Sequence, residues 1–78
     1  NYVGEIDYGA GLEAYAFRSA HNTHIVWAEE DQTLTILVPQ ANFVEAYSQY
    51  GDVLPKAPVG EDYQIEVGFS PIYIIFDN

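Results

Sequence analysis

LEAYAFRSAHNTHIVWA (residues 12–28) holds two strand-like segments on either side of a polar break. Residues 12–19 alternate with a period of two, which predicts a β-strand. The polar residues His21 and Asn22 interrupt this pattern, and residues 23–28 form a β-branched and aromatic run that predicts a second strand. Two such segments joined by a short polar break are typical of a β-hairpin.

The same alternation recurs further along the chain. The segments concerned are TLTILVP (33–39), YQIEVG (63–68) and SPIYIIFDN (70–78). In the last of them Ile72, Ile74 and Phe76 share one face, while Tyr73 and Ile75 share the other. We therefore expect this strand to be buried on both sides.

Residues 41–50, ANFVEAYSQY, fit two interpretations. Phe43, Tyr47 and Tyr50 would line one face of a helix that Gly51 could cap. The segment also alternates with a period of two, and a helix here would lie between strands without the length of a parallel crossover. We favour a strand.

Glycine and proline mark the remaining segments as connections. Residues 1–11 contain three glycines and predict an extended lead-in with a turn, and residues 51–62 contain two prolines and two glycines and predict a loop. We therefore predict an all-β fold for the whole chain, a small antiparallel β-sandwich of about seven short strands. Residues 1–78 are expected to form one domain.

The amino-acid composition indicates which interactions can stabilise the fold. Of the 78 residues, 49% are hydrophobic and 15% are aromatic, so a packed core is expected. Cysteine is absent, so disulfides and thiolate metal sites cannot supplement that core. We expect an interior built from the seven tyrosines, the four phenylalanines, the single Trp27 and the aliphatic side chains.

Charge excludes some partners. Two basic residues face twelve carboxylates, for a net charge of −10, so nucleic acid would be repelled and is not an expected partner. No apolar run approaches the roughly 20 residues that span a bilayer, so no membrane partner is expected either. The chain begins at Asn1 without methionine, which suggests a processed product or a fragment, and we favour an extracellular or periplasmic location.

Catalytic and metal-binding patterns are weak. There is no cysteine, and no serine lies in a Gly-x-Ser-x-Gly turn, so no catalytic residue is predicted. His21 and His24 have a His-x-x-His spacing, but on a strand this spacing directs the two rings to opposite faces. We predict no metal site and no cofactor.

Aromatic residues provide the candidate contact site. Trp27, Tyr47 and Tyr50 are our candidates for contact with carbohydrate or with a neighbouring domain. A sugar-binding platform would need at least two rings, from these three and Tyr8, to be exposed and coplanar. Packing in the core is the alternative role for the same rings.

Several motifs resemble a known kind of domain. The motifs are Tyr15 and Phe17 followed by Val26 and Trp27, the string YSQYGDVLP (47–55), and the closing SPIYI (70–74). Together they resemble the C-terminal β-sandwich appendage of (β/α)8-barrel glycoside hydrolases. The resemblance implies a non-catalytic accessory domain that packs against the catalytic barrel of the parent chain or of its processed partner. It carries over no catalytic residue, because the acid and nucleophile of such enzymes lie on the barrel.

Three alternatives stay open. The chain could be a carbohydrate-binding module, or an acidic interaction or inhibitor domain whose carboxylates are aligned at phosphate-like spacing. Residues 71–76 are also similar to the end of the β domain of pyocin-type bacteriocins, which implies a role in translocation or linkage. The accessory-domain hypothesis predicts an exposed apolar patch of several hundred Å², roughly, where the barrel would pack.

Overall fold

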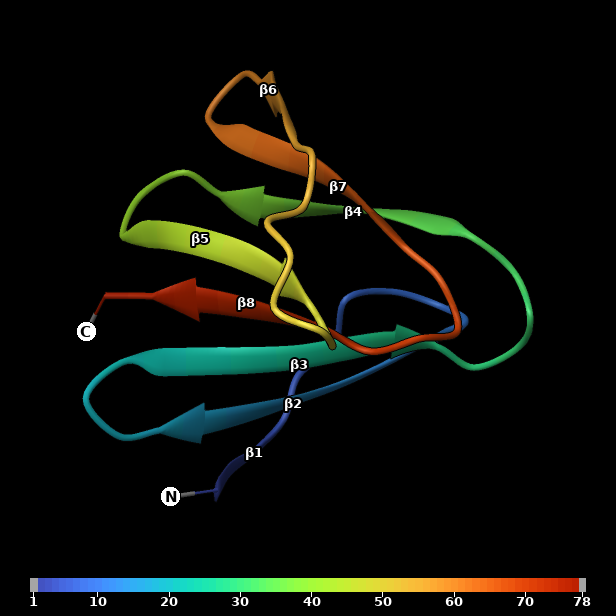
Figure 1. Ribbon diagram of the computed structural model, residues 1–78, viewed down its shortest axis with the longest axis horizontal. Helices are drawn as coiled ribbons and strands as arrows, with labels where there is room; N and C mark the ends of the chain where they lie inside the picture. Colours follow the sequence, from blue (N-terminus) through green and yellow to red (C-terminus); the bar gives the residue numbers. More distant parts are fainter. Residues whose placement is uncertain (1, 78) are drawn as a thin grey trace.

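The computed structural model describes residues 2–77, which form eight antiparallel strands in two packed sheets (Figure 1). The strands are β1 (Tyr2–Glu5), β2 (Leu12–Arg18), β3 (Asn22–Ala28), β4 (Leu34–Pro39), β5 (Phe43–Ser48), β6 (Ala57–Val59), β7 (Asp62–Val67) and β8 (Ile72–Phe76). One sheet has the order β1-β2-β3-β8-β5 and the other the order β4-β7-β6. The predicted all-β sandwich is confirmed. Within residues 2–77 there is no helix with the length and apolarity that a membrane span requires.

Local predictions account for most of the strands. β2 and β3 form the expected hairpin, paired from Leu12 with Ala28 to Arg18 with Asn22. Residues 43–48 are a strand and not a helix, because β5 pairs along its length with the interior strand β8. That pairing satisfies backbone groups that a helix would have satisfied internally.

Two short strands were not predicted. β1 lies in the glycine-containing lead-in and pairs with β2, and β6 lies in the expected loop and pairs with β7. Gly60 has a φ of 60° in the two-residue turn between Val59 and Asp62, which closes the β6–β7 hairpin. These additions make eight strands where about seven were expected.

The edges of both sheets are interrupted. The register of β1 shifts near its start, and that of β5 shifts between Phe43 and Glu45. In the smaller sheet, Pro39 ends β4 and Pro58 occupies the middle of β6, where neither can donate a ladder hydrogen bond. All four edge strands thus carry a bulge or a proline.

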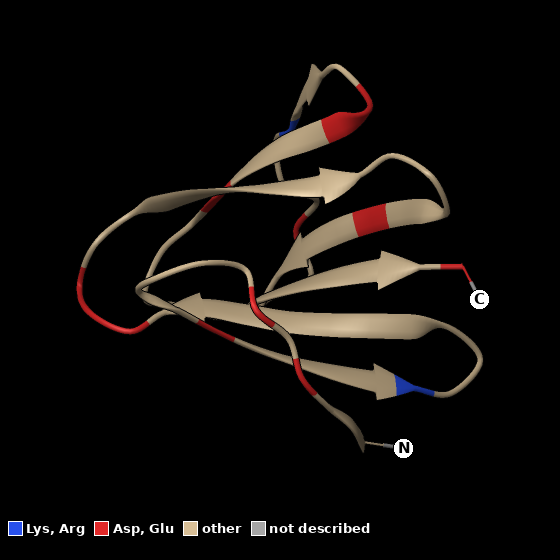
Figure 2. Cartoon of the chain, turned by 180° about the vertical axis from the view of Figure 1, so that it is seen from behind, with Lys and Arg blue, Asp and Glu red and all other residues tan. Residues whose placement is uncertain are grey.

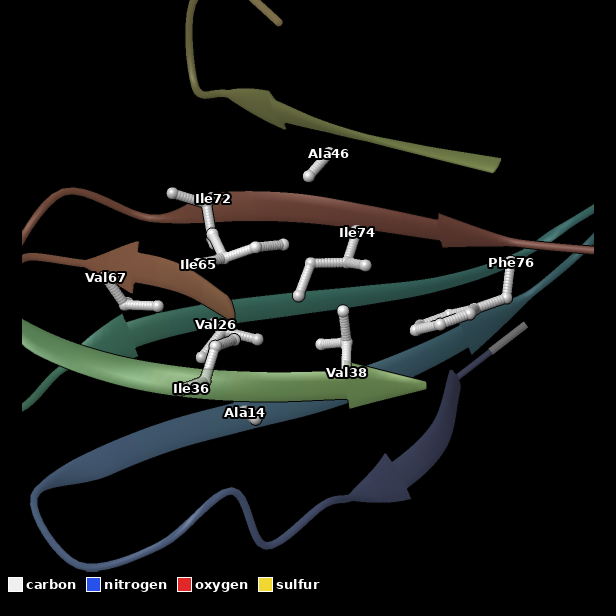
Figure 3. Close-up of a cluster of buried hydrophobic side chains, with 10 residues drawn as sticks. All are labelled: Ala14, Val26, Ile36, Val38, Ala46, Ile65, Val67, Ile72, Ile74 and Phe76. Carbon is white, nitrogen blue, oxygen red and sulfur yellow. The ribbon is translucent and has the colours of Figure 1, made fainter. Parts of the chain in front are cut away.

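The core lies between the sheets and consists mainly of aliphatic side chains (Figure 3). Its buried members are Ala14, Val26, Ile36, Val38, Ala46, Ile65, Val67, Ile72, Ile74 and Phe76. Phe76 is the single aromatic ring in this buried set, while Tyr8, Phe43 and Tyr63 pack partly buried at its margin. The expectation of an interior built from the rings, Trp27 among them, was therefore wrong.

Small inward residues explain this outcome. On β2, Ala14 and Ala16 are buried, so alternation sends Tyr15 and Phe17 to the opposite face. Alanines on the larger sheet leave room for the isoleucines and valines of the smaller sheet, as a close-packed interior requires.

The faces of β8 were assigned correctly on the inner side. Ile72, Ile74 and Phe76 are buried, as predicted. Tyr73 and Ile75 are half-buried on the outer side, and no strand of residues 2–77 packs over them. Burial on both sides was therefore not found within the described chain.

Candidate functional site

The outer face of the five-stranded sheet carries most of the rings that the core leaves out. We use the name outer face for the side turned away from β4, β7 and β6, with the side chains of Tyr2, Tyr15, Phe17, Ile25, Trp27, Tyr47, Tyr73 and Ile75. One continuous row crosses four strands, because Tyr15 pairs with Ile25, Ile25 with Tyr73, and Tyr73 with Tyr47. Directly opposite residues of an antiparallel sheet project on the same side. An isolated bridge from Tyr47 to Val53 extends the row past β5.

Ring contacts join the residues at one end of this face. Tyr15 and Trp27 are stacked, with centroids 5.5 Å apart and an interplanar angle of 25°. The ring of Tyr2 lies 6.2 Å from that of Tyr15 and 5.6 Å from that of Phe17. Tyr2 and Tyr15 each contact two of the other rings, so the four rings form a connected cluster. Such ring pairs add stability beyond that of burial alone. We call these four residues the aromatic cluster.

Carboxylates flank the aromatic cluster. Glu5 is the register partner of Tyr15, and Glu13 is the register partner of Trp27. The charge of Glu13 raises the pKa of the Tyr15 hydroxyl, with smaller contributions from desolvation, Glu5 and Tyr2. The direction of this shift indicates that negative charge surrounds the phenol.

The two basic residues are outside the aromatic cluster. Arg18 follows Phe17 at the end of β2 and alternates to the opposite side of the sheet, and Lys56 lies in the connection from β5 to β6. Nζ of Lys56 donates a hydrogen bond to Glu45 at 2.7 Å, which is the main reason why the pKa of Glu45 is lowered. Acidic segments are spread over both sheets and several turns (Figure 2). The full charges that act on the Tyr15 hydroxyl are therefore those of Glu13 and Glu5.

No family model, curated protein or solved structure matches the chain. The resemblance to accessory domains of barrel glycoside hydrolases therefore stays a prediction.

The structure separates the predicted site residues into two groups. Trp27 on β3 and Tyr47 on β5 share the outer face, with β8 between them. Tyr50 is 83% exposed in the turn after β5, where its backbone N–H donates a hydrogen bond to Oγ of Ser48. Tyr8 lies in the connection from β1 to β2 and packs against the core.

Tyr8 belongs to a second, smaller feature at one end of the sandwich. Its hydroxyl is hydrogen-bonded to Nδ1 of His24 at 2.7 Å. Burial raises the pKa of Tyr8 to about 12 and lowers the pKa of His24, so both groups are neutral at pH 7. Both line an open pocket of about 260 Å³ with Asn22, whose Oδ1 is buried with no hydrogen-bond partner among the described residues.

The histidines do not form a metal site with their neighbours. His21 lies in the β2–β3 turn with Nδ1 3.6 Å from Oδ1 of Asp77, while His24 lies on the inner side of β3. Across residues 2–77, no group of three or more His, Cys, Asp or Glu side chains is placed to hold a metal ion.

A larger pocket lies beside the connection from β5 to β6. Its volume is about 540 Å³, and it is lined by Leu54, Pro55, Lys56, Ala57, Gln64 and Glu66. This lining contains one carboxylate, one ammonium group and no hydroxyl or imidazole. Since Lys56 is already bonded to Glu45, the pocket offers no nucleophile with an adjacent base.

Sequence reasoning missed several residues of the outer face. Tyr2, Tyr15, Ile25 and Tyr73 were assigned to strands or to packing, but not to a site. The sequence carried a partial signal, the alternation of small and large apolar residues in AYAF (14–17) and VWA (26–28), which separates two faces but does not show which of them is the inner one. In a two-layer fold, the small residues can pack against the second sheet and leave the large rings outside.

Proposed function

We propose that this chain is a non-catalytic accessory module that packs its outer face against the (β/α)8 barrel of a glycoside hydrolase. The observation that carries the proposal is the row Tyr15, Ile25, Tyr73 and Tyr47, which crosses the sheet with no strand of residues 2–77 over it. An antiparallel sheet with one solvated face normally alternates apolar-in and polar-out. Here the outer face of the larger sheet also carries a run of large apolar side chains, with Glu5 and Glu13 at its β1–β2 end.

Energetics favour coverage of this face. Burying apolar surface stabilises a complex by about 25 cal/mol per Å², and aromatic rings contribute the largest areas. Contiguous apolar patches of this kind mark interaction surfaces on small domains. On the outer face Tyr2 and Phe17 are exposed and the other six side chains are half-buried, as expected of a surface that a second domain completes.

The partner follows from the sequence motifs. The motif of Tyr15, Phe17, Val26 and Trp27 and the closing SPIYI (70–74) resemble those of accessory domains. The first lies on β2 and β3, and the second leads into the adjacent strand β8. The proposed partner is the catalytic barrel of the same parent chain or of its processed product. An extracellular or periplasmic setting goes with this proposal.

A carbohydrate-binding module is the second candidate, because Trp27 and Tyr47 share the outer face. A sugar stacks on the flat face of an exposed ring. One face of Trp27 is already stacked on Tyr15, which reduces the platform available to a ligand. Glycan binding that Trp27→Ala abolishes would favour this candidate over the first.

The other two alternatives receive less support. The acidic residues are spread over turns and both sheets, whereas a phosphate mimic needs them aligned on one face (Figure 2). The similarity of residues 71–76 to bacteriocin β domains concerns β8, whose buried side chains are explained by the core.

The test uses the parent protein. Translation of the reading frame upstream of Asn1 should show the repeating strand–helix pattern of a barrel. In that protein, Tyr73→Ser should release this domain from the barrel, seen as separate unfolding transitions in calorimetry. The control Leu37→Ser changes an exposed residue of the smaller sheet and should leave a single transition. An upstream sequence without a barrel, or equal effects of the two substitutions, would overturn the proposal.

A further inference from the structure

We propose that the aromatic cluster, together with Glu5 and Glu13, receives an arginine side chain of the docking partner. This inference rests on the proposed function, since it specifies the chemistry of the surface that meets the outer face. It concerns the β1–β2–β3 end of that face. Towards β5 the row continues with Tyr73 and Tyr47, and the carboxylate beside it, Glu45, is already paired with Lys56, so no charged counterpart is needed there.

The geometry places ring surfaces and carboxylates together. Tyr15 and Trp27 are stacked on adjacent strands, and each has a glutamate directly opposite it on the neighbouring strand. Tyr2 is 60% exposed and contacts both Tyr15 and Phe17, so it forms an accessible wall of the cluster. A cation placed here would meet π-surfaces and negative charge at once.

The charge pattern selects a cation over a neutral partner. Both carboxylates are neighbours of the Tyr15 ring, since Glu13 lies two residues before it on β2 and Glu5 is its register partner on β1. In keeping with this, Glu13 raises the pKa of the Tyr15 hydroxyl, with smaller contributions from desolvation and Glu5. Lys56, the nearest basic residue on the β5 side, is bonded to Glu45. A purely apolar partner would bury the two glutamates without compensation, which is costly. A basic side chain from the partner removes this cost.

Arginine fits this arrangement better than lysine. Its guanidinium group is planar, stacks on aromatic faces and has donors in several directions, so it can contact a ring and two carboxylates together. Lysine carries a compact, strongly hydrated charge that loses more on desolvation. Because Glu5 lies opposite Tyr15 and Glu13 lies between Tyr15 and Trp27 in the register, stacking and charge pairing are available to the same group.

Trp27 makes the test direct, since it is the single tryptophan of the chain and lies within the cluster. The chain is titrated with acetyl-Gly-Arg-Gly-amide and with its citrulline analogue, which has the same shape without the charge. We expect saturable quenching of Trp27 fluorescence by the arginine peptide, with half-saturation on the order of millimolar, and binding at least about fivefold weaker for the citrulline peptide. Equal responses to the two peptides, or no response to the arginine peptide up to about 100 mM, would overturn the inference.

A matched pair of variants separates local from general electrostatics. Glu13→Gln removes the carboxylate opposite Trp27, and Glu66→Gln makes the same charge change on an exposed position of β7 in the other sheet. We expect about fivefold weaker binding for Glu13→Gln and less than about a twofold change for Glu66→Gln. Equal weakening by both would show only nonspecific attraction to an acidic chain.

The two proposals fail in different ways. If the parent protein shows the Tyr73→Ser effect but the arginine peptide does not bind, the accessory function stands and the arginine site is wrong. If the peptide binds selectively but no barrel docks, the site stands and the proposed partner is wrong.

Discussion

The hydroxyl of Tyr8 and Nδ1 of His24 are hydrogen-bonded at 2.7 Å, which ties the β1–β2 connection to the inner side of β3. The ring of His24 also lies 4.8 Å from that of Phe76, a member of the core. A titratable pair is thus built into one end of the sandwich. Two pH-dependent predictions come from it.

His24 should make the protein less stable in mild acid. Burial lowers its pKa in the folded state below the ordinary value of 6.5, so the unfolded state binds more protons as the pH falls through 6.5. The stability that neutral His24 provides is complete above pH 6.5 and is lost as the pH falls towards the folded-state pKa. Urea unfolding followed by Trp27 fluorescence at pH 7.5, 6.5 and 5.5, roughly the window above carboxylate titration, measures this loss. His24→Gln should flatten the dependence, and His21→Gln should retain it; parallel curves for both variants would contradict the assignment.

Tyr8 should act in the opposite direction at high pH. Burial raises the pKa of Tyr8 to about 12, whereas in the unfolded chain its pKa has the ordinary value of 10.0. The unfolded state therefore holds fewer protons between these values, and stability falls as the pH rises from 10 to 12. Tyr8→Phe should reduce this fall, and it should cost about 1 kcal/mol at neutral pH through the lost hydrogen bond. Tyr50→Phe is the exposed control; absorbance at about 295 nm follows phenolate formation, and a Tyr8 that ionises with the exposed tyrosines would refute the prediction.

Adjacent isoleucines of β8 test which face is the core. Ile74 is completely buried between the sheets, and Ile75 is half-buried on the outer face. Ile74→Ala should lower the free energy of unfolding by about 3 kcal/mol because it opens a cavity, and Ile75→Ala by about 1 kcal/mol or less. Chemical denaturation of the isolated chain measures both. Equal costs would mean that the outer face is covered in solution, for example by self-association, which gel filtration detects.

Gly11 should not tolerate a side chain. Its φ is +82°, and an added Cβ would lie 3.1 Å from Cδ1 of Leu34 and 3.2 Å from Nε2 of Gln32. Gly11→Ala should therefore cost about 1–3 kcal/mol of backbone strain and a further cost of about 1 kcal/mol from crowding. Gly9→Ala is the comparison, because Gly9 also has a positive φ, of +126°, but open space around its Cβ position. The midpoint of thermal unfolding should be lower for Gly11→Ala than for Gly9→Ala. The reverse order would contradict the crowding by Leu34 that is expected at Gly11.

Local alternation was enough to predict some faces and not others. In TLTILVP the polar threonines show which face is solvated, so the burial of Ile36 and Val38 was predictable. In AYAF both faces are apolar, so the pattern alone could not show that Ala14 and Ala16 would point inward. Only the volume of the opposing sheet decides this, and that is a property of the tertiary structure.

The order of the strands in the sheets could also not be predicted from the sequence. Trp27 and Tyr47 were both predicted as contact residues, but their common face depends on β8 lying between β3 and β5. β8 is far from both in the chain, and no turn signal specifies such a pairing. β6 was missed for a related reason, since three residues around Pro58 become a strand only by pairing with β7.

The bulges and prolines at the four sheet edges limit how this molecule can associate. A row of unpaired backbone N–H and C=O groups at a sheet edge can pair with a strand of another chain, and repeated addition of strands leads to fibrils. The bulges and prolines disfavour such addition of a strand. Contact with another molecule is then favoured through the side chains of the ring-rich surface, so its selectivity can change by single substitutions while the backbone framework stays intact.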